Sequence, residues 1–197
     1  MSFFVKICGI TSAEAADAAI ESGADAIGFV FADSPRRIEA AQANAIAEDL
    51  PSDVLRVAVF RRPTLSEIGA VLGEFGADVV QADHESLVGF EDRPILPVYH
   101  EPVTERPVHP RFLYEGARSG VGTRVDEAEA RRLARLGEMV LAGGLDPRNV
   151  GASIAAIRPY GVDVSSGVET TPGVKSPELI RSFVAAARSA AERLVSA

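Results

Sequence analysis

Residues 5–31 read VKICGITSAEAADAAIESGADAIGFVF, in which an apolar strand, a helix and a second apolar strand follow one another closely. Thr11 and Glu14 fit a capping box at the start of the helix. Gly23 supplies the left-handed residue that commonly ends a helix. Two strands that are joined through a helix form a βαβ unit, in which they run parallel. This stretch therefore predicts a fold built from βα units.

The same alternation of strand and helix continues through most of the chain. Three helix-to-strand joints share a glycine and an aspartate, and we interpret the first two aspartates, Asp25 and Asp78, as turn residues. Asp163, in the third joint, is expected to point inward. Eight strands are predicted, at residues 5–8, 26–31, 55–60, 79–82, 95–99, 112–114, 139–142 and 162–165. The predicted helices begin near Thr11, Ala40, Thr64, Glu85, Asp126, Asn149 and Ser176.

The middle of the chain departs from this rhythm, because five of its twelve prolines lie between residues 94 and 110. No helix survives that density of proline. We therefore predict an α/β fold, a closed (β/α)8 TIM barrel in which residues 1–197 form one domain. In this barrel the helix after the fourth strand (helix 4) is shortened, and the helix after the fifth strand (helix 5) is absent or replaced by a proline-rich loop. An open doubly wound sheet is the alternative, but the glycine-rich dinucleotide fingerprint expected after its first strand is absent.

Composition limits the possible functions. The chain is 47% hydrophobic and 24% charged, and its net charge of −8 with dispersed basic residues argues against nucleic-acid binding. A single cysteine excludes an internal disulfide framework and fits a reducing cytoplasm, and three scattered histidines offer no metal-ligand spacing. We expect neither export nor membrane insertion, because no apolar run approaches the roughly 18 residues of a membrane helix.

The first strand carries a lysine and the only cysteine on the same face. Side chains alternate along a strand, so Lys6 and Cys8 look into the same space while Val5 and Ile7 look the opposite way. If that space is the interior of a barrel, Cys8 lies near the end where such barrels keep their chemistry. Cys8 is then a candidate base or nucleophile. The alternative is that it is a small buried hydrophobe.

Two loops rich in small residues follow the last two strands. Gly143 and Gly144 follow the seventh strand, and Ser165, Ser166 and Gly167 follow the eighth. In barrels of this kind, phosphate binds at these loops through closely approaching backbone amides. Each loop taken alone could equally be a tight turn, but the two together favour a phosphate site.

Two further loops contain candidate binding residues. Arg36 and Arg37 follow the second strand, where a guanidinium could hold a carboxylate through two hydrogen bonds, and we expect one of the two to be a solvated surface arginine. Residues 119–124, SGVGTR, follow the sixth strand and could act as a lid or as a further phosphate contact.

The chain resembles the phosphoribosylanthranilate isomerase family in motifs that recur in order from end to end. The matching segments are residues 6–11, 23–31, 34–36, 141–145 with Asn149, and 163–169 with Pro172 and Gly173. The stretch from about Asp83 to Asp126 resembles the family poorly.

The resemblance implies a cofactor-free Amadori rearrangement in tryptophan biosynthesis. An acid protonates the ring oxygen of N-(5-phosphoribosyl)anthranilate so that a Schiff base forms, and a base then removes the proton from ribose C2. Cys8 matches the family's base, with Lys6 or the polar mouth of the barrel helping to poise its thiol. Glu115 stands where the family has its acidic aspartate. By the same match, Arg36 holds the anthranilate carboxylate, and Gly144 with Ser166 and Gly167 binds phosphate.

Two departures from the family pattern affect the site. Glu115 is one methylene longer than the family's aspartate, and Asp126 is an alternative acid that helix capping would explain instead. After the fourth strand the family reads Gln-Leu-His-Gly, whereas this chain reads Gln81-Ala82-Asp83-His84. The histidine is displaced by one position, so no role is carried over to His84. Asp163 is expected to orient the network around Lys6.

Two other functions compete with the isomerase. A dual-substrate phosphosugar isomerase that also acts in histidine biosynthesis would use the same phosphate loops, but it is expected to have an aspartate where this chain has Cys8. A barrel that binds phosphate without catalysis is the second alternative. The expected partner is a phosphorylated small molecule, and the chain is expected to be a monomer or a homodimer.

Overall fold

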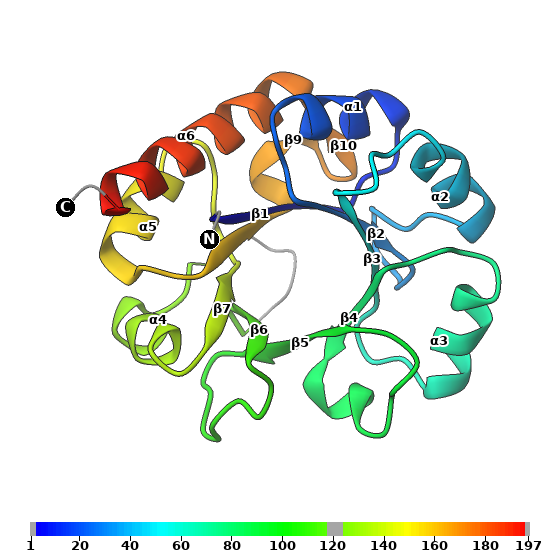
Figure 1. The fold of residues 1–197 in the computed structure, drawn as a ribbon, viewed down its shortest axis with the longest axis horizontal. Helices are drawn as coiled ribbons and strands as arrows, with labels where there is room; N and C mark the ends of the chain where they lie inside the picture. The colour runs from blue at the N-terminus through cyan, green and yellow to red at the C-terminus, as the bar shows by residue number, and fades with distance from the viewer. Residues whose placement is uncertain (1–2, 118–123, 196–197) are drawn as a thin grey trace.

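The computed structural model describes residues 3–117 and 124–195, and it contains the predicted closed barrel of eight parallel strands. Figure 1 shows the ring of strands with the helices outside it. The strands are β1 (Phe4–Cys8), β2 (Ala26–Val30), β3 (Leu55–Val59), β4 (Val79–Asp83), β5 (Ile95–His100), β6 (Arg111–Glu115), β7 (Glu138–Leu141) and β8 (Gly161–Val164). Each strand pairs with the next, and β8 pairs with β1 to close the ring.

Helices cover the outside of this ring. They are α1 (Ala13–Glu21), α2 (Ala40–Ala47), α3 (Leu65–Leu72), α4 (Glu127–Ala134), α5 (Val150–Ile157) and α6 (Pro177–Val195). The last of them, α6, packs against both α5 and α1 (Figure 1). A short hairpin of β9 (Glu169–Thr171) and β10 (Val174–Lys175) follows β8. No helix within the described ranges is long and apolar enough to cross a membrane.

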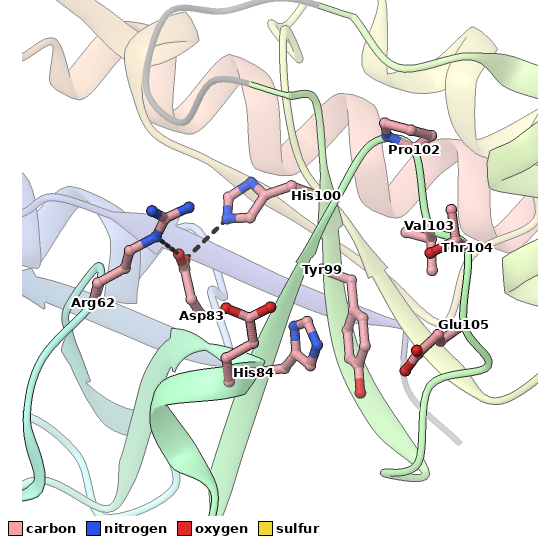
Figure 2. A pocket seen from close by; sticks show the side chains of 10 residues that line it. Arg62, Asp83, His84, Tyr99, His100, Pro102, Val103, Thr104 and Glu105 are labelled. Carbon is pink, nitrogen blue, oxygen red and sulfur yellow. Dashed lines mark hydrogen bonds and ion pairs between the residues drawn. The ribbon is translucent and has the colours of Figure 1, made fainter.

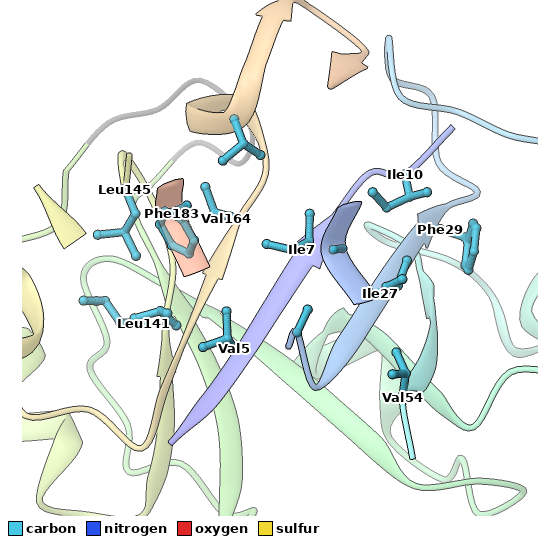
Figure 3. Close-up of a cluster of buried hydrophobic side chains, with 14 of the residues drawn as sticks. Val5, Ile7, Ile10, Ile27, Phe29, Val54, Leu141, Leu145, Val164 and Phe183 are labelled. Atoms are coloured by element: carbon cyan, nitrogen blue, oxygen red, sulfur yellow. The ribbon is translucent and has the colours of Figure 1, made fainter. Parts of the chain in front are cut away.

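Side-chain alternation divides the apolar residues into two layers. Val5 and Ile7 pack outward with the helices, together with residues such as Ile27 and Phe183 (Figure 3). Cys8 belongs to a separate inner cluster that fills the barrel. The prediction that β1 presents different faces to the two layers is confirmed. Burying the outer layer between strands and helices supplies most of the hydrophobic stabilisation of this fold.

The joints between helices and strands confirm part of the predicted turn chemistry. The carboxylate of Asp25 accepts a hydrogen bond from the backbone N–H of Val5 at 2.7 Å, and Asp78 accepts one from Arg56 at 2.8 Å. Each aspartate therefore ties the start of its own strand to a neighbouring strand. The third joint differs, because helix α5 ends at Arg158, which has a φ of 55°, whereas Gly161 lies within β8.

The helix starts agree with the sequence except at α1. The N-cap of α1 is Ser12, whose hydroxyl accepts from the N–H of Ala15, so the prediction of a box formed by Thr11 and Glu14 is wrong. The hydroxyl of Thr11 instead donates to the carbonyl of Gly173 at 3.1 Å. Thr64, near which a helix is predicted to begin, is the N-cap of α3 and forms a capping box with Glu67. The strand and helix bounds otherwise differ from the predicted ones by a few residues.

The two shortened units lie where the sequence predicts them. After β4 a 3-10 helix, His84–Leu87, replaces a full α-helix, and residues 101–110, all of them described, contain no helix. This proline-rich loop is held by α4. The backbone N–H of Val103 donates to Glu129 at 2.8 Å, and Arg132 donates to the Val103 carbonyl at 3.0 Å. Side chains of α4 thus fasten the loop that stands in place of a helix.

Gly161 lies where β8 comes close to β1, so a substitution at this position tests that close approach. A Cβ built at this position would lie 2.4 Å from the backbone oxygen of Phe4. We expect Gly161→Ala to lower the free energy of unfolding by about 1–3 kcal/mol, the usual cost of overpacking, as measured by urea denaturation. The control is Gly69→Ala on an exposed position of α3, where nothing lies within 4 Å and the same change should stabilise by about 0.5–1 kcal/mol. Equal effects at the two positions would contradict this reading.

Candidate active site

A cavity of about 150 Å³, lined by both polar and apolar side chains, opens at the carboxyl ends of the strands. Its walls include Cys8 from β1, Arg36 from the loop after β2, Glu115 from β6, and Asp163 with Ser165 from the end of β8. The structure therefore brings together five of the residues that the sequence singled out. Gln81 and Asp83 of β4 also line it. In (β/α)8 barrels this end is where active sites are found.

A buried ion pair lies directly below Cys8. The ammonium of Lys6, which is fully buried, donates to the carboxylate of Asp163 at 2.8 Å. The register explains the meeting, because Lys6 is paired with Asp163 across the β1–β8 seam and both side chains point inward. Burial disfavours the charged ammonium, but the Asp163 carboxylate and the sulfur of Cys8 outweigh this and raise the pKa of Lys6. Lys6 is therefore a permanent cation at the base of the cavity.

Cys8 rests as a neutral thiol. Burial raises the pKa of Cys8, and the positive charge of Lys6, which opposes that rise, does not overcome it. Because the Lys6 ammonium also pairs with Asp163, it stabilises the Cys8 thiolate less than the sequence suggests. Space for both side chains comes from Gly28 on β2, where an added Cβ would lie 3.0 Å from the sulfur and 3.2 Å from the Lys6 ammonium.

Arg36 makes a two-pronged contact with a carboxylate of the protein itself. Its Nε and Nη2 donate to the two oxygens of Glu169 at 2.8 and 2.9 Å. Lys175 of β10 also donates to Glu169, at 2.6 Å, and to the carbonyl of Ser165 at 2.9 Å. Partial burial disfavours the Glu169 carboxylate, but hydrogen bonds from Arg36 and Lys175 lower its pKa below the usual range. Two cations thus meet one carboxylate at the rim of the cavity.

The two small-residue loops lie against each other. Gly167 has no room for a side chain, because a Cβ there would lie 1.9 Å from the carbonyl oxygen of Leu145. Gly143 and Gly144 both have positive φ, at 88° and 63°. Asn149 fixes this loop by donating to the Gly144 carbonyl at 2.8 Å. Ser166 begins a 3-10 turn beside them. Of the segment proposed as a lid, residues 119–123 lie outside the described residues.

Three side chains form a row along the mouth on β4, β5 and β6. His100 lies between Asp83, whose oxygen is 2.9 Å from Nε2, and Glu115, whose oxygen is 3.6 Å from Nδ1. Figure 2 shows Arg62 and His100 converging on Asp83, while His84 stacks on the ring of Tyr99. His84 and His100 both line a neighbouring hollow of about 340 Å³, and Asp83 lies between this hollow and the cavity because it lines both.

Other sequence candidates have simpler roles. Asp126 accepts a hydrogen bond from the N–H of Glu129 at 2.8 Å, which is the capping role expected of it. Arg37 is exposed and pairs with Glu39 at 3.1 Å. Gly143 lines a separate hollow beside Arg124. Within the described part of the chain, no three His, Cys, Asp or Glu side chains are grouped so as to hold a metal ion.

Sequence reasoning missed His100, Lys175 and the roles of Gly28 and Glu169. His100 could have been found from its position at the end of a strand in register with Glu115. Gly28 could have been found from its pairing with Cys8. Lys175 carried no such signal, because its approach to Ser165 depends on the fold of the β9–β10 hairpin.

The fold and the cavity at its carboxyl end define this protein as a (β/α)8-barrel enzyme. A family model described as N-(5'phosphoribosyl)anthranilate (PRA) isomerase matches residues 5–186, and the chain belongs to that family. N-(5'-phosphoribosyl)anthranilate isomerase of Rubrobacter xylanophilus is 39% identical to this chain, in an alignment that covers 94% of this chain and 98% of the relative.

Two solved structures extend the comparison. A phosphoribosyl anthranilate isomerase in complex with reduced 1-(o-carboxyphenylamino)-1-deoxyribulose 5-phosphate is 32% identical, with a TM-score of 0.80 over 96% of this chain and 100% of that chain. Monomers of the dimeric phosphoribosylanthranilate isomerase from Thermotoga maritima are 33% identical, with a TM-score of 0.82 and the same coverage. The resemblance stated from the sequence is confirmed.

The buried pair of Lys6 and Asp163 yields a stability prediction. Asp163→Asn leaves a buried ammonium without its counter-charge, and we expect the free energy of unfolding to fall by about 3–5 kcal/mol. Adding Lys6→Met to that variant removes the uncompensated charge, so the double variant should be more stable than Asp163→Asn alone. Chemical denaturation of the four proteins measures both effects. A double variant whose loss equals the sum of the two single losses would rule out the coupling.

Proposed function

We propose that Cys8 and Glu115 are the base and the acid of the isomerisation of N-(5'-phosphoribosyl)anthranilate, the reaction of tryptophan biosynthesis to which its family assigns this chain. The observation that carries the proposal is that a thiol and a carboxyl face one cavity at the catalytic end of the barrel. The reaction is an aldose–ketose isomerisation of the Amadori type, and it requires one group of each kind.

The acid opens the furanose ring. Glu115 gives a proton to the ring oxygen as the carbon–oxygen bond breaks, and the nitrogen lone pair forms the Schiff base. A carboxyl one methylene longer than the family's aspartate can serve if its support places it correctly. Glu115 ends β6 and is mostly shielded, with 16% of its side chain exposed, so its position is restricted by the barrel wall.

The base then removes the proton from ribose C2 and produces an enolamine, which tautomerises to the ketone. Cys8 must be a thiolate to do this. Since burial keeps the resting group protonated, the thiolate forms only as a minor species, and Lys6 stabilises it through the positive charge below the sulfur. Asp163 orients Lys6 through their hydrogen bond. Asp163 is therefore a positioning residue for the base.

Charged and backbone groups hold the two ends of the substrate. Arg36 takes the anthranilate carboxylate, because its guanidinium already presents two donors to a carboxylate at the rim. The loop amides at Gly143 and Gly144, with those at Ser165, Ser166 and Gly167, take the phosphate, which the adjoining glycine-rich loops can approach closely. The two anchors place the ribose between Cys8 and Glu115.

The family relationship leaves two assembly states, monomer and homodimer. The Thermotoga maritima relative is dimeric, and a structure of its monomers is also known. In this chain Val88 and Val108 are exposed on the shortened fourth and fifth units. We propose that these units are where a second copy would pack, and light scattering of the intact chain measures whether one does.

Removing either proton-transfer group should abolish turnover. We expect Cys8→Ala and Glu115→Gln each to lower kcat by about 10²–10⁴-fold, measured as the loss of phosphoribosylanthranilate fluorescence at equal enzyme concentration. Arg37→Gln, on an exposed residue of the same loop as Arg36, is the control and should keep full activity. Full turnover in Glu115→Gln would remove the acid assignment. Supplying the related histidine-pathway aminoaldose to the wild type tests the dual-substrate alternative.

Arg36→Ala should act on binding rather than on the chemical step. A charge-assisted pair of hydrogen bonds contributes about 1.5–3 kcal/mol, so we expect KM to rise by roughly 10- to 150-fold with a smaller change in kcat. Glu169 keeps Lys175 as a partner in this variant, so the fold should persist. An unchanged KM would show that the anthranilate carboxylate binds elsewhere.

A further inference from the structure

Among the described residues, the groups that face the two ring nitrogens of His100 are hydrogen-bond acceptors. Nε2 lies 2.9 Å from a carboxylate oxygen of Asp83. Nδ1 lies 3.4 Å from the carbonyl oxygen of Gly116 and 3.6 Å from a carboxylate oxygen of Glu115. A neutral imidazole has one nitrogen that accepts, and here that nitrogen would oppose a lone pair. The surroundings therefore select the imidazolium, in which both nitrogens donate.

The charges around this imidazolium favour it further. Asp83 on β4 and Glu115 on β6 flank it, and Arg62 from the loop after β3 pairs with the other oxygen of Asp83 at 2.9 Å. Arg62 is 78% exposed, so water screens its repulsion. Glu85 and Glu105 line the adjoining hollow and add negative charge. The hydrogen bond that His100 donates to Asp83 raises the pKa of His100 above its ordinary value, against the effect of partial burial.

A carboxyl acid at neutral pH needs a source for its proton. A carboxyl group with the ordinary pKa of glutamate, about 4.3, is ionised at neutral pH and must gain a proton before it can donate one. The imidazolium places a proton on Nδ1, 3.6 Å from the Glu115 carboxylate, so a small movement of either side chain brings the two groups into hydrogen-bonding distance. His100 and Glu115 together then hold a single proton at the mouth of the cavity, where the ring oxygen of the substrate is expected.

We propose that His100 holds the proton that Glu115 delivers to the substrate, and that Asp83 keeps His100 charged until the transfer. The proposal rests on Glu115 being the acid. His100 acts through Glu115 and is a positioning and proton-holding residue, as Asp83 is. Asp83 stands at the position on β4 where the family motif has its histidine. In this chain β4 therefore contributes a carboxylate, and the imidazole comes from His100 on β5.

The proton balance closes over one turnover. The proton on Nδ1 passes to Glu115, and Glu115 passes one to the ring oxygen as the carbon–oxygen bond pair moves onto that oxygen. His100 is left neutral, with Nε2–H still donating to Asp83. When the enol becomes the ketone, Cys8 returns the proton taken from C2 to C1, and the enol hydroxyl proton leaves to solvent, so the Cys8 thiolate is restored. His100 recovers a proton from solvent, to which 26% of its side chain is exposed.

The test compares the titration of His100 with the pH dependence of catalysis in the intact chain. His100 is followed by NMR of its imidazole C–H signals in the wild type and in Asp83→Asn, and kcat/KM for phosphoribosylanthranilate is measured across the same pH range. We expect one limb of the bell-shaped profile to coincide with the His100 pKa. In Asp83→Asn that limb and the NMR pKa should move together to lower pH, while the limb due to Cys8 stays in place.

His100→Asn and His84→Asn form a matched pair of histidine variants. We expect His100→Asn to lower kcat at least tenfold with a smaller change in KM, and His84→Asn, whose ring stacks on Tyr99, to leave the pH profile unchanged. A profile that stays fixed in Asp83→Asn while the His100 pKa moves would overturn the proposal. Full activity in Glu115→Gln would instead refute the acid assignment itself, so the two failures are distinguishable.

Discussion

The buried ion pair between Lys6 and Asp163 is the contact on which the rest of the site depends. It joins β1 to β8, the two strands at which the barrel closes. Burying two charges is costly unless they meet in good geometry, so the pair fixes the register of this seam. Cys8 lies two residues after Lys6, and Ser165 lies two residues after Asp163, so each points to the same side of its strand as the ion-pair residue before it. The register that makes the pair therefore also sets the height of the thiol and of the loop after β8.

Much of this arrangement follows from local sequence rules. Alternation along a strand predicted that Lys6 and Cys8 share the inner face and that Val5 and Ile7 face the helices. The proline cluster predicted the loss of a helix between β5 and β6, because proline removes a donor and breaks a helical turn. Such features depend on neighbours in sequence, and a single chain displays them directly.

What escaped prediction depends on contacts between distant segments. Thr11 has the character of a helix cap, but a carbonyl of Gly173, far along the chain, takes its hydroxyl and leaves the capping to Ser12. His100 gains its partners only when β5 is placed between β4 and β6. Lys175 reaches Ser165 only through the β9–β10 hairpin. No local pattern encodes these meetings, because each is decided by register and hairpin geometry across the whole fold.

Glu169 gives the rim of the cavity a built-in rival for any incoming anion. A carboxylate attached to the protein competes at an effective concentration of about millimolar or more without having to diffuse in. Small free carboxylates meet the Arg36 guanidinium already occupied and have only one anchor with which to displace it. A molecule that carries a second, well-separated anionic group can recruit another part of the mouth at the same time. If Arg36 binds the substrate carboxylate as proposed, this ion pair must open first, and ligands with two anionic groups are then favoured over ligands with one.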